Sequence, residues 1–243
     1  MLGLGIQLPW RQQALGIPRA GLVAYHDLYD PTASLASVPD LSGNGYALRL
    51  GSTAGADTND PAWAAGGKGL VFTTDDYCLT ADLPAMDLAS PFTWVLIAKG
   101  ITGDGNYIGG LCLPTGYSNY VLLQHFGPNA WRLRWDDGTG GVYNQLTVAD
   151  DALHCVSVVR APSSLKWKIW DTGTVGMMGT LRSPAGTPRL GLACMPGSSA
   201  LYPWAKGEAL TSLLWNRALS DAELQRIYRT LKATWAARSV TIS

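Results

Sequence analysis

The sequence predicts an all-β fold, a sandwich of two antiparallel sheets closed by one C-terminal helix. Short strand-like runs are separated by Gly-rich turns at close spacing, as at 40–45 (DLSGNG), 103–105 and 136–141. Two of these runs alternate apolar and basic residues, and the one strong helical period comes at the end of the chain. Regular short strands with such turns are typical of sandwiches and barrels rather than of α/β folds.

Alternation identifies the strands that border the predicted core. Apolar residues alternate with Arg132 and Arg134 at 131–135, and with Lys166 and Lys168 at 165–170, so each strand has one buried and one wet face. The runs 92–98 and 154–159 are apolar or small at nearly every position, as in central strands covered on both faces. We also expect strands at 22–25 and 208–216. The tryptophans expected in the core are Trp94, Trp131, Trp135 and Trp167, whereas Trp10, Trp63 and Trp204 could equally be interface or ligand platforms.

The end of the chain changes to a helical period. Ser220 is a good N-cap, Glu223 completes a capping box, and Leu219 and Leu224 occupy the two hydrophobic staple positions. One apolar stripe then follows at spacings of three and four: Leu224, Ile227, Tyr228, Leu231 and Trp235. The sequence therefore predicts a helix from Asp221 to about Ala236 that lies on the sandwich.

We divide the chain into an N-terminal arm, residues 1–20, and one body, residues 21–243. The arm should be extended, because Gly and Pro prevent a long helix and its apolar residues alternate. Either it pairs with a sheet of its own body, or it docks on a neighbouring subunit. Its candidate assembly residues are Leu2, Leu4, Ile6, Leu8 and Trp10.

Composition excludes several classes of partner. The 243 residues carry a formal net charge of zero, so the electrostatic field that nucleic-acid or anionic-membrane binding usually requires is missing. No run reaches the length of apolar sequence that spans a bilayer, and the first residues lack the basic region of a signal peptide. The four cysteines are widely spaced among apolar residues, which favours buried thiols in a protein made in a reducing cytoplasm.

Three segments resemble the laminin-G-like domains of the concanavalin A-like lectin and glucanase superfamily. They are the turn 40–45 (DLSGNG), the strand 91–95 (PFTWV) and the strand-to-helix signature 215–223 (WNRALSDAE), and they span about residues 21–235 in the family's order. The resemblance implies a concanavalin-like jelly roll. The arm, the missing signal peptide and the Arg- and Ala-rich tail at 231–243 further resemble virion proteins of tailed bacteriophages.

The enzymes of this superfamily use a pair of glutamates on one strand, and that pattern is absent. The chain has two glutamates, Glu223 in the predicted cap and Glu208 without an acidic neighbour at strand spacing. Adjacent aspartates, as at 75–76, 136–137 and 150–151, would point to opposite faces of a strand and are read as turn residues. The three histidines lack zinc-site spacing, and no nucleotide-binding motif occurs, while a Ser-His-Asp constellation stays open because its members lie far apart in sequence. We expect no enzyme.

The resemblance implies that sugars or calcium bind at loops on the rim of the sandwich. The candidate ligand-binding residues are Asp104 and Asn106 in the loop GDGNY, with Tyr117, Asn119 and Tyr120 in the loop GYSNY. Oxygens of Asp104 and Asn106 could take calcium, and the tyrosines could stack on sugar rings. The alternative is that these residues are ordinary turn formers. No cofactor is required, and calcium is an optional ligand.

The leading hypothesis is a non-catalytic structural and binding protein of a bacteriophage virion, either head decoration or tail component. It would be made in the host cytoplasm, form homo-oligomers, assemble with other virion proteins through its arm and sandwich surfaces, and contact host glycans. The alternatives are a free-standing carbohydrate-binding module and, second, a glycan hydrolase.

Overall fold

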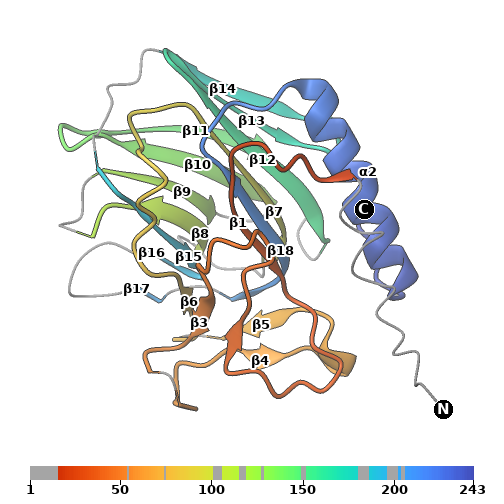
Figure 1. The fold of residues 1–243 in the computed structure, drawn as a ribbon. Coiled ribbons are helices and arrows are strands. Elements are labelled where there is room, and N and C mark those ends of the chain that lie inside the picture. The colour runs from red at the N-terminus through yellow and green to blue at the C-terminus, as the bar shows by residue number, and fades with distance from the viewer. Residues whose placement is uncertain are drawn as a thin grey trace.

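A computed structural model shows two antiparallel sheets packed face to face, with a helix on the outside of one of them (Figure 1). The structure describes residues 16–53, 55–73, 75–100, 106–114, 119–126, 129–148, 152–179, 186–195, 202–203 and 206–243; of Asn106, Tyr202 and Pro203 only the backbone is described. Both sheets contain eight strands, which confirms the predicted jelly-roll sandwich.

The first sheet is built around two central strands, β7 (Phe92–Gly100) and β18 (Gly207–Trp215). In spatial order its strands are β14 (Val175–Gly179), β13 (Ser164–Ile169), β12 (His154–Ala161), β7, β18, β5 (Leu70–Phe72) and β4 (Ala62–Trp63). Beyond the part that pairs with β5, β18 pairs with β1 (Leu22–Asp27). The expected central runs at 92–98 and 154–159 are therefore neighbours inside this sheet.

The second sheet has two long hairpins at one end, formed by the first two strands of its spatial order and by the two beside them. In spatial order its strands are β11 (Gly141–Thr147), β10 (Ala130–Asp136), β9 (Tyr120–His125), β8 (Asn106–Cys112), β15 (Arg189–Leu192), β6 (Cys78–Leu79), β3 (Leu48–Leu50) and β2 (Ser37–Val38). A short ladder of β16 (Cys194–Met195) and β17 (Tyr202–Pro203) and a 3-10 turn, η2 (Ala65–Gly67), complete the described elements.

The main core lies between the sheets and is rich in tryptophan, as the alternation predicts. Trp94, Trp131, Trp135 and Trp167 are buried there. Two of them satisfy their indole N–H groups inside the core: Trp94 donates to Ser212 Oγ (3.1 Å), and Trp167 of the first sheet donates to Asn144 Oδ1 of the second (2.8 Å). The second bond connects the two sheets near their edges, because Asn144 lies on the edge strand β11 and Trp167 lies on β13, next to the edge strand β14.

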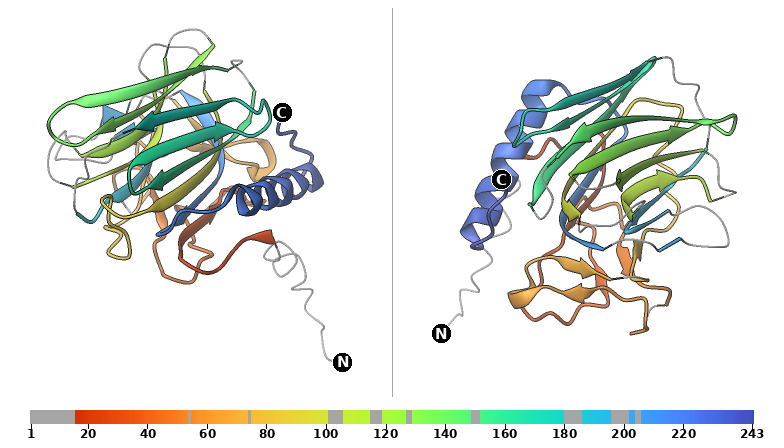
Figure 2. Two further views of the ribbon diagram at one scale, coloured as in Figure 1. Left: turned by 90° about the horizontal axis from the view of Figure 1, so that it is seen from above. Right: turned by 180° about the vertical axis from the view of Figure 1, so that it is seen from behind.

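A second core lies between the first sheet and α2 (Asp221–Ala237), so the predicted helix is confirmed. Figure 2 shows the helix on one side of the molecule and strands β8–β11 on the other. The buried helix residues are Leu224, Ile227, Leu231 and Trp235, and they face outward-pointing residues of the sheet such as Val95, Ile97 and Leu213. Arg238, the residue that follows α2 in the chain, donates two hydrogen bonds of 2.7 Å to the buried carboxylate of Asp27 on β1.

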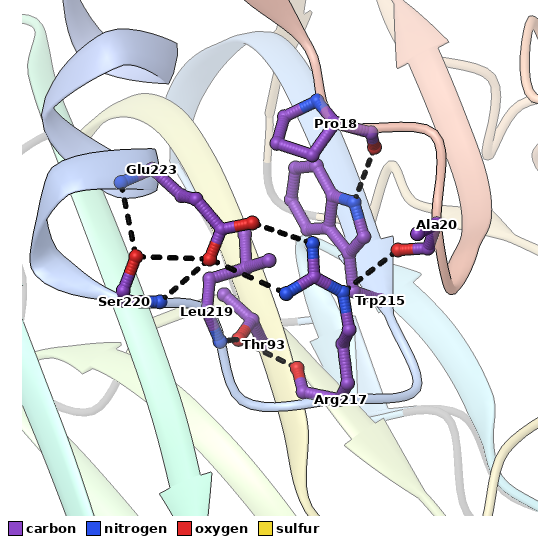
Figure 3. Close-up of polar contacts among 8 residues, drawn as sticks. All are labelled: Pro18, Ala20, Thr93, Trp215, Arg217, Leu219, Ser220 and Glu223. Carbon is purple, nitrogen blue, oxygen red and sulfur yellow. Dashed lines mark hydrogen bonds and ion pairs between the residues drawn. The ribbon is translucent and has the colours of Figure 1, made fainter.

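The junction between β18 and α2 is a dense polar network (Figure 3). Ser220 and Glu223 form the predicted capping box, and Glu223 also accepts both ends of the Arg217 guanidinium (2.6 and 3.3 Å). Arg217 Nε donates to the Ala20 carbonyl and Trp215 Nε1 to the Pro18 carbonyl, each at 2.8 Å. This network ties the residues before β1 to the end of β18, which are nearly two hundred positions apart in the sequence.

The other strand predictions hold to within a few residues. The segments expected at 131–135, 165–170, 22–25 and 208–216 are β10, β13, β1 and β18. All four cysteines are buried and free, as expected, and burial raises the pKa of the Cys112 thiol to about 12. Trp63 is half-buried against the main core, whereas Trp10 and Trp204 lie outside the described residues.

The predicted arm is described only from residue 16 onward, so its candidate assembly residues lie outside the described part. Ile17, which we assigned to the arm, is buried in the core beneath α2. Among the described residues, no helix combines the length and the apolar composition that a membrane crossing demands.

Candidate functional site

The predicted rim residues are only partly described, and those that are do not form one cluster. Asp104 and Tyr117 lie outside the described residues, and of Asn106 only the backbone is described. Asn106 pairs with His125 at one end of the β8–β9 hairpin, whereas Tyr120 pairs with Cys112 at the other end. Because the strands are antiparallel, Asn106 at the start of β8 and Tyr120 at the start of β9 lie at opposite ends of the sheet.

Asn119 and Tyr120 have backbone and packing roles at their end of the hairpin. Asn119 has a positive φ of 70° and its carbonyl accepts the amide of Leu113 (3.1 Å). Tyr120 is only 2% exposed, and burial raises the pKa of its hydroxyl, with the neighbouring Asp136 carboxylate acting in the same direction. Its ring is therefore covered and does not offer a stacking platform to solvent.

The outer face of strands β8–β11 gathers polar and aromatic groups from several strands. Trp131, Leu133 and Trp135 point into the core, so alternation along β10 sends Arg132, Arg134 and Asp136 outward. The register extends each of these into a row across four strands. From β8 to β11 the rows are Tyr107–Gln124–Arg132–Gln145, Gly110–Leu122–Arg134–Tyr143 and Cys112–Tyr120–Asp136–Gly141.

Arg132 is held between two aromatic rings on this face. Its Cζ lies 3.4 Å from the ring centre of Phe126, which follows β9, and 4.2 Å from that of Tyr143 on β11. Its Nη2 donates a 3.3 Å hydrogen bond to Gln145 Oε1 on β11, and its buried Nε has no hydrogen-bond partner. Within the described part of the chain, no carboxylate forms an ion pair with Arg132. The two rings and the hydrogen bond therefore fix the orientation of the guanidinium, while no carboxylate of the described residues neutralises its positive charge.

Arg134 lies two residues further along β10 on the same face. Its Cζ is 5.2 Å from the ring centre of Tyr120, and its Nη2 is 4.0 Å from Asp136 Oδ2, a long ion pair. The Arg134 side chain is 40% exposed. Asp136 is itself engaged, because its Oδ1 accepts the Gly138 amide at 2.8 Å. Two cations and one carboxylate therefore give this part of the face a positive charge.

One end of the face is covered and the other is open. Met195 of β16 packs on Cys112, Tyr120 and Leu122, which form a small apolar cluster with Tyr107 at its margin. Towards β11 the side chains are accessible: Tyr143 is 62% exposed and Phe126 is 37% exposed. We call the accessible group the open face, and it comprises Phe126, Arg132, Arg134, Tyr143 and Gln145.

Sequence reasoning placed Arg132 and Arg134 on a wet face but did not find the aromatic residues around them. The signal was available in part, since Val142 and Leu146 in the segment 141–147 (GVYNQLT) alternate with Tyr143, Gln145 and Thr147. Asn144 interrupts the apolar side of that alternation, because it points inward to accept the Trp167 indole N–H. Because this inward-facing residue is polar, the alternation of apolar residues by which a strand is predicted is interrupted.

Groups able to carry catalysis or hold a metal are engaged elsewhere in the described part of the chain. His154 and Asp171 form a 2.6 Å contact, but both side chains are at most 2% exposed and Trp131 packs edge-on against the imidazole. Glu223 belongs to the helix cap. Among the described residues, no three His, Cys, Asp or Glu side chains are grouped so that they could hold a metal ion.

Glu208, the second glutamate, lines a small hollow at the start of β18. Lys99, Lys206 and Phe72 line it as well, and burial raises the pKa of Glu208 while the charge of Lys99 opposes the shift. The hollow encloses about 10 Å³, room for one water molecule at most. A sugar ring does not fit there.

Comparison with known proteins identifies the fold and no family. No family model and no curated protein sequence matches the chain. Among solved structures it is similar to the binding domain of botulinum neurotoxin DC in complex with rat synaptotagmin II (TM-score 0.60, 8% identity, 87% of this chain and 51% of the other). It is also similar to Trypanosoma rangeli sialidase in complex with sialic acid (TM-score 0.65, 13% identity, 90% and 34%) and to the neurotoxin DC binding domain in complex with SialylT (TM-score 0.62, 9% identity, 88% and 52%).

The chain therefore spans about half of these toxin binding domains and about a third of the sialidase. At these identities the likeness concerns the sandwich alone. It supports the expected jelly-roll sandwich, while residues with a role in binding have to be found from the geometry of this chain.

Proposed function

We propose that the protein is a non-catalytic glycan-binding module that holds its ligand on the open face of the second sheet. The observation that carries the proposal is the stack of Phe126, Arg132 and Tyr143, which presents aromatic and polar groups side by side on an accessible surface. Sugars offer apolar C–H faces between hydroxyl groups, so rings for stacking and planar donors for hydrogen bonds suit them.

Two further observations support binding rather than cleavage. Several similar structures are complexes with sugars by their descriptions, sialic acid for the sialidase and SialylT for the toxin domain. The two glutamates of this chain lie on separate elements, Glu208 at the first residues of β18 and Glu223 in α2, so they do not form a pair along one strand. The proposal therefore keeps the protein outside the glycosidases, and calcium is not needed for it.

A glycan array with purified protein tests this proposal. The wild-type protein should bind a subset of glycans saturably, and Tyr143→Ala should weaken that binding about fivefold or more, because stacking of an aromatic ring on a sugar contributes on the order of 1 kcal/mol or more. Leu35→Ala is the matched control, since Leu35 is also exposed (41%) but lies in the loop before β2, away from the open face. Equal loss in both variants, or no saturable binding to any glycan, contradicts the proposal.

We also propose that this module is part of a bacteriophage virion, as the arm and the tail of the sequence suggest. The supporting structural observation is that the edge strands β14 and β11 expose Val175, Met177 and Val142 (45%, 62% and 47%). Exposed apolar residues on unpaired strand edges are typical of assembly surfaces. Light scattering of the purified protein and mass spectrometry of purified particles test this; a stable monomer that is absent from particles contradicts it.

A further inference from the structure

Arg132 on the open face is paired differently from Arg217 and Arg238, two arginines that face carboxylates. Arg217 faces Glu223, and Arg238 faces Asp27 while stacking on Tyr29 and Trp235 at 4.1 and 4.6 Å. Arg132 has the same kind of aromatic support as Arg238, but its one hydrogen-bond acceptor among the described residues is the neutral amide of Gln145. An arginine whose guanidinium has a fixed orientation and faces no anion of the described residues is preorganised to bind an anion from outside the chain.

From this we infer that the open face binds an acidic saccharide whose carboxylate or sulfate is held by the Arg132 guanidinium while the adjoining sugar ring lies against Tyr143. This inference rests on the proposed function and names the ligand class for the same site. A planar guanidinium matches oxyanions with its fork of N–H donors, and such charge-assisted bonds are about twice as strong as neutral ones.

The surroundings of Arg132 favour an anion over a neutral group. Arg134 adds a second positive charge on the same face, and its nearest carboxylate, Asp136, is 4.0 Å away and already accepts the Gly138 amide. Phe126 and Tyr143 shield the faces of the Arg132 guanidinium from water. A bound oxyanion therefore interacts with a partly desolvated cation, which strengthens the attraction.

Paired ligands that share a sugar backbone and differ in charge test the inference by titration calorimetry. The pairs are hexagalacturonate with its full methyl ester, sialyllactose with its methyl ester, and a carrageenan-derived hexasaccharide with its desulfated form. The first two carry carboxylates and the third carries sulfates, so the result also identifies the anionic group. We expect the acidic member of at least one pair to bind about tenfold or more tightly than its neutral counterpart, with an affinity that falls as salt is added.

Three variants locate the effect at Arg132. Arg132→Gln should reduce the affinity for the acidic ligand to that for the neutral one, and Arg132→Lys should recover only part of it, because a point charge lacks the fork. Arg49→Gln is the control: Arg49 is an exposed cation on β3 of the same sheet, and its removal should change the affinity less than twofold.

The possible results separate the inference from the proposed function. If neutral members bind as well as acidic ones, or Arg49→Gln weakens binding as much as Arg132→Gln does, the inference is wrong and the glycan-binding function stands. If no glycan binds, both are wrong. If an acidic protein binds in place of any saccharide, the face is a protein interface and the inference is wrong as well.

Discussion

The strand–helix junction and the open face each have an arginine at their centre, but the two arginines are paired in opposite ways. At the junction, Arg217 donates to the Glu223 carboxylate and to the Ala20 carbonyl, and the carboxylate is also bound to Ser220. On the open face, Arg132 stacks on two rings and donates one 3.3 Å bond to an amide. The junction satisfies its polar groups within the chain, whereas the open face does not.

This difference separates groups that hold the fold from groups that remain for a ligand. A fully paired network contributes to stability, since removal of one member leaves the others without partners. A cation on an exposed face contributes little to stability, because exposed charges gain little from the chain around them. Substitutions at the junction should therefore lower stability, and substitutions on the open face should lower binding.

The largest effect is expected for Trp215→Ala at the junction. Trp215 is the last residue of β18 and is fully buried in the core beneath α2, and its indole donates to the Pro18 carbonyl, so the variant leaves a large cavity and an unpaired carbonyl. We expect a loss of about 3–5 kcal/mol in the free energy of unfolding, measured by urea denaturation. Tyr143→Ala, the aromatic counterpart on the open face, should lose about 1 kcal/mol or less, the range of an exposed cation–π contact.

If Trp215→Ala does not fold, Trp215→Phe provides the same comparison at smaller amplitude, since it keeps the ring and loses the hydrogen bond. A loss for Tyr143→Ala that equals the loss for Trp215→Phe would contradict the division between the two regions.

A smaller effect, with a pH signature, is expected for Glu223→Gln. The hydrogen bonds from Arg217 and then from Ser220 lower the pKa of Glu223 from 4.5 to about 2. A carboxyl whose pKa is lowered by folding stabilises the native state above its unfolded pKa. That contribution is present above about pH 4.5 and is lost as the pH falls towards 2. At pH 7 we expect the variant to lose about 1–2 kcal/mol.

The measurement is the difference in unfolding free energy between wild type and Glu223→Gln at a series of pH values from 7 to about 3. Asp221→Asn is the control in the same helical turn, because Asp221 is 67% exposed and its one ion pair among the described residues is with the partly exposed Lys166. Its cost should be below about 1 kcal/mol. A difference for Glu223→Gln that does not shrink in acid shows that the carboxylate charge is not what the junction uses.

The sequence predicts the junction better than the open face because the residues of the helix cap interact with near neighbours in the sequence. Ser220 and Glu223 are three residues apart and the staple leucines flank them, so cap, box and helix could all be predicted and were confirmed. The contacts with Pro18 and Ala20, by contrast, join residues 197 positions apart, and no local pattern indicates them.

The open face depends on register, which the sequence determines only weakly. The alternation of β10 predicted that Arg132 and Arg134 face solvent, and they do. Their aromatic neighbours come from two other strands or strand ends, and only the pairing of Arg132 with Gln124 and Gln145 brings Phe126 and Tyr143 beside them. The predicted rim loops, in contrast, were chosen by composition, and antiparallel pairing places their described residues Asn106 and Tyr120 at opposite ends of one hairpin.

The smallest expected effect concerns the coupling between Arg132 and its rings, and it compares the two arginines directly. A double-mutant cycle with Arg132→Ala and Tyr143→Ala should give a coupling of about 0.5–1 kcal/mol in the free energy of unfolding, the range of exposed cation–π contacts. The same cycle with Arg217→Ala and Glu223→Ala should give more, because that pair is hydrogen-bonded at 2.6 Å and supports a helix cap. The order of the two coupling energies is the decisive result. If Arg132 and Tyr143 are coupled more strongly than Arg217 and Glu223, the stack is a stabilising element of the sheet, and the unneutralised charge on Arg132 no longer indicates a ligand.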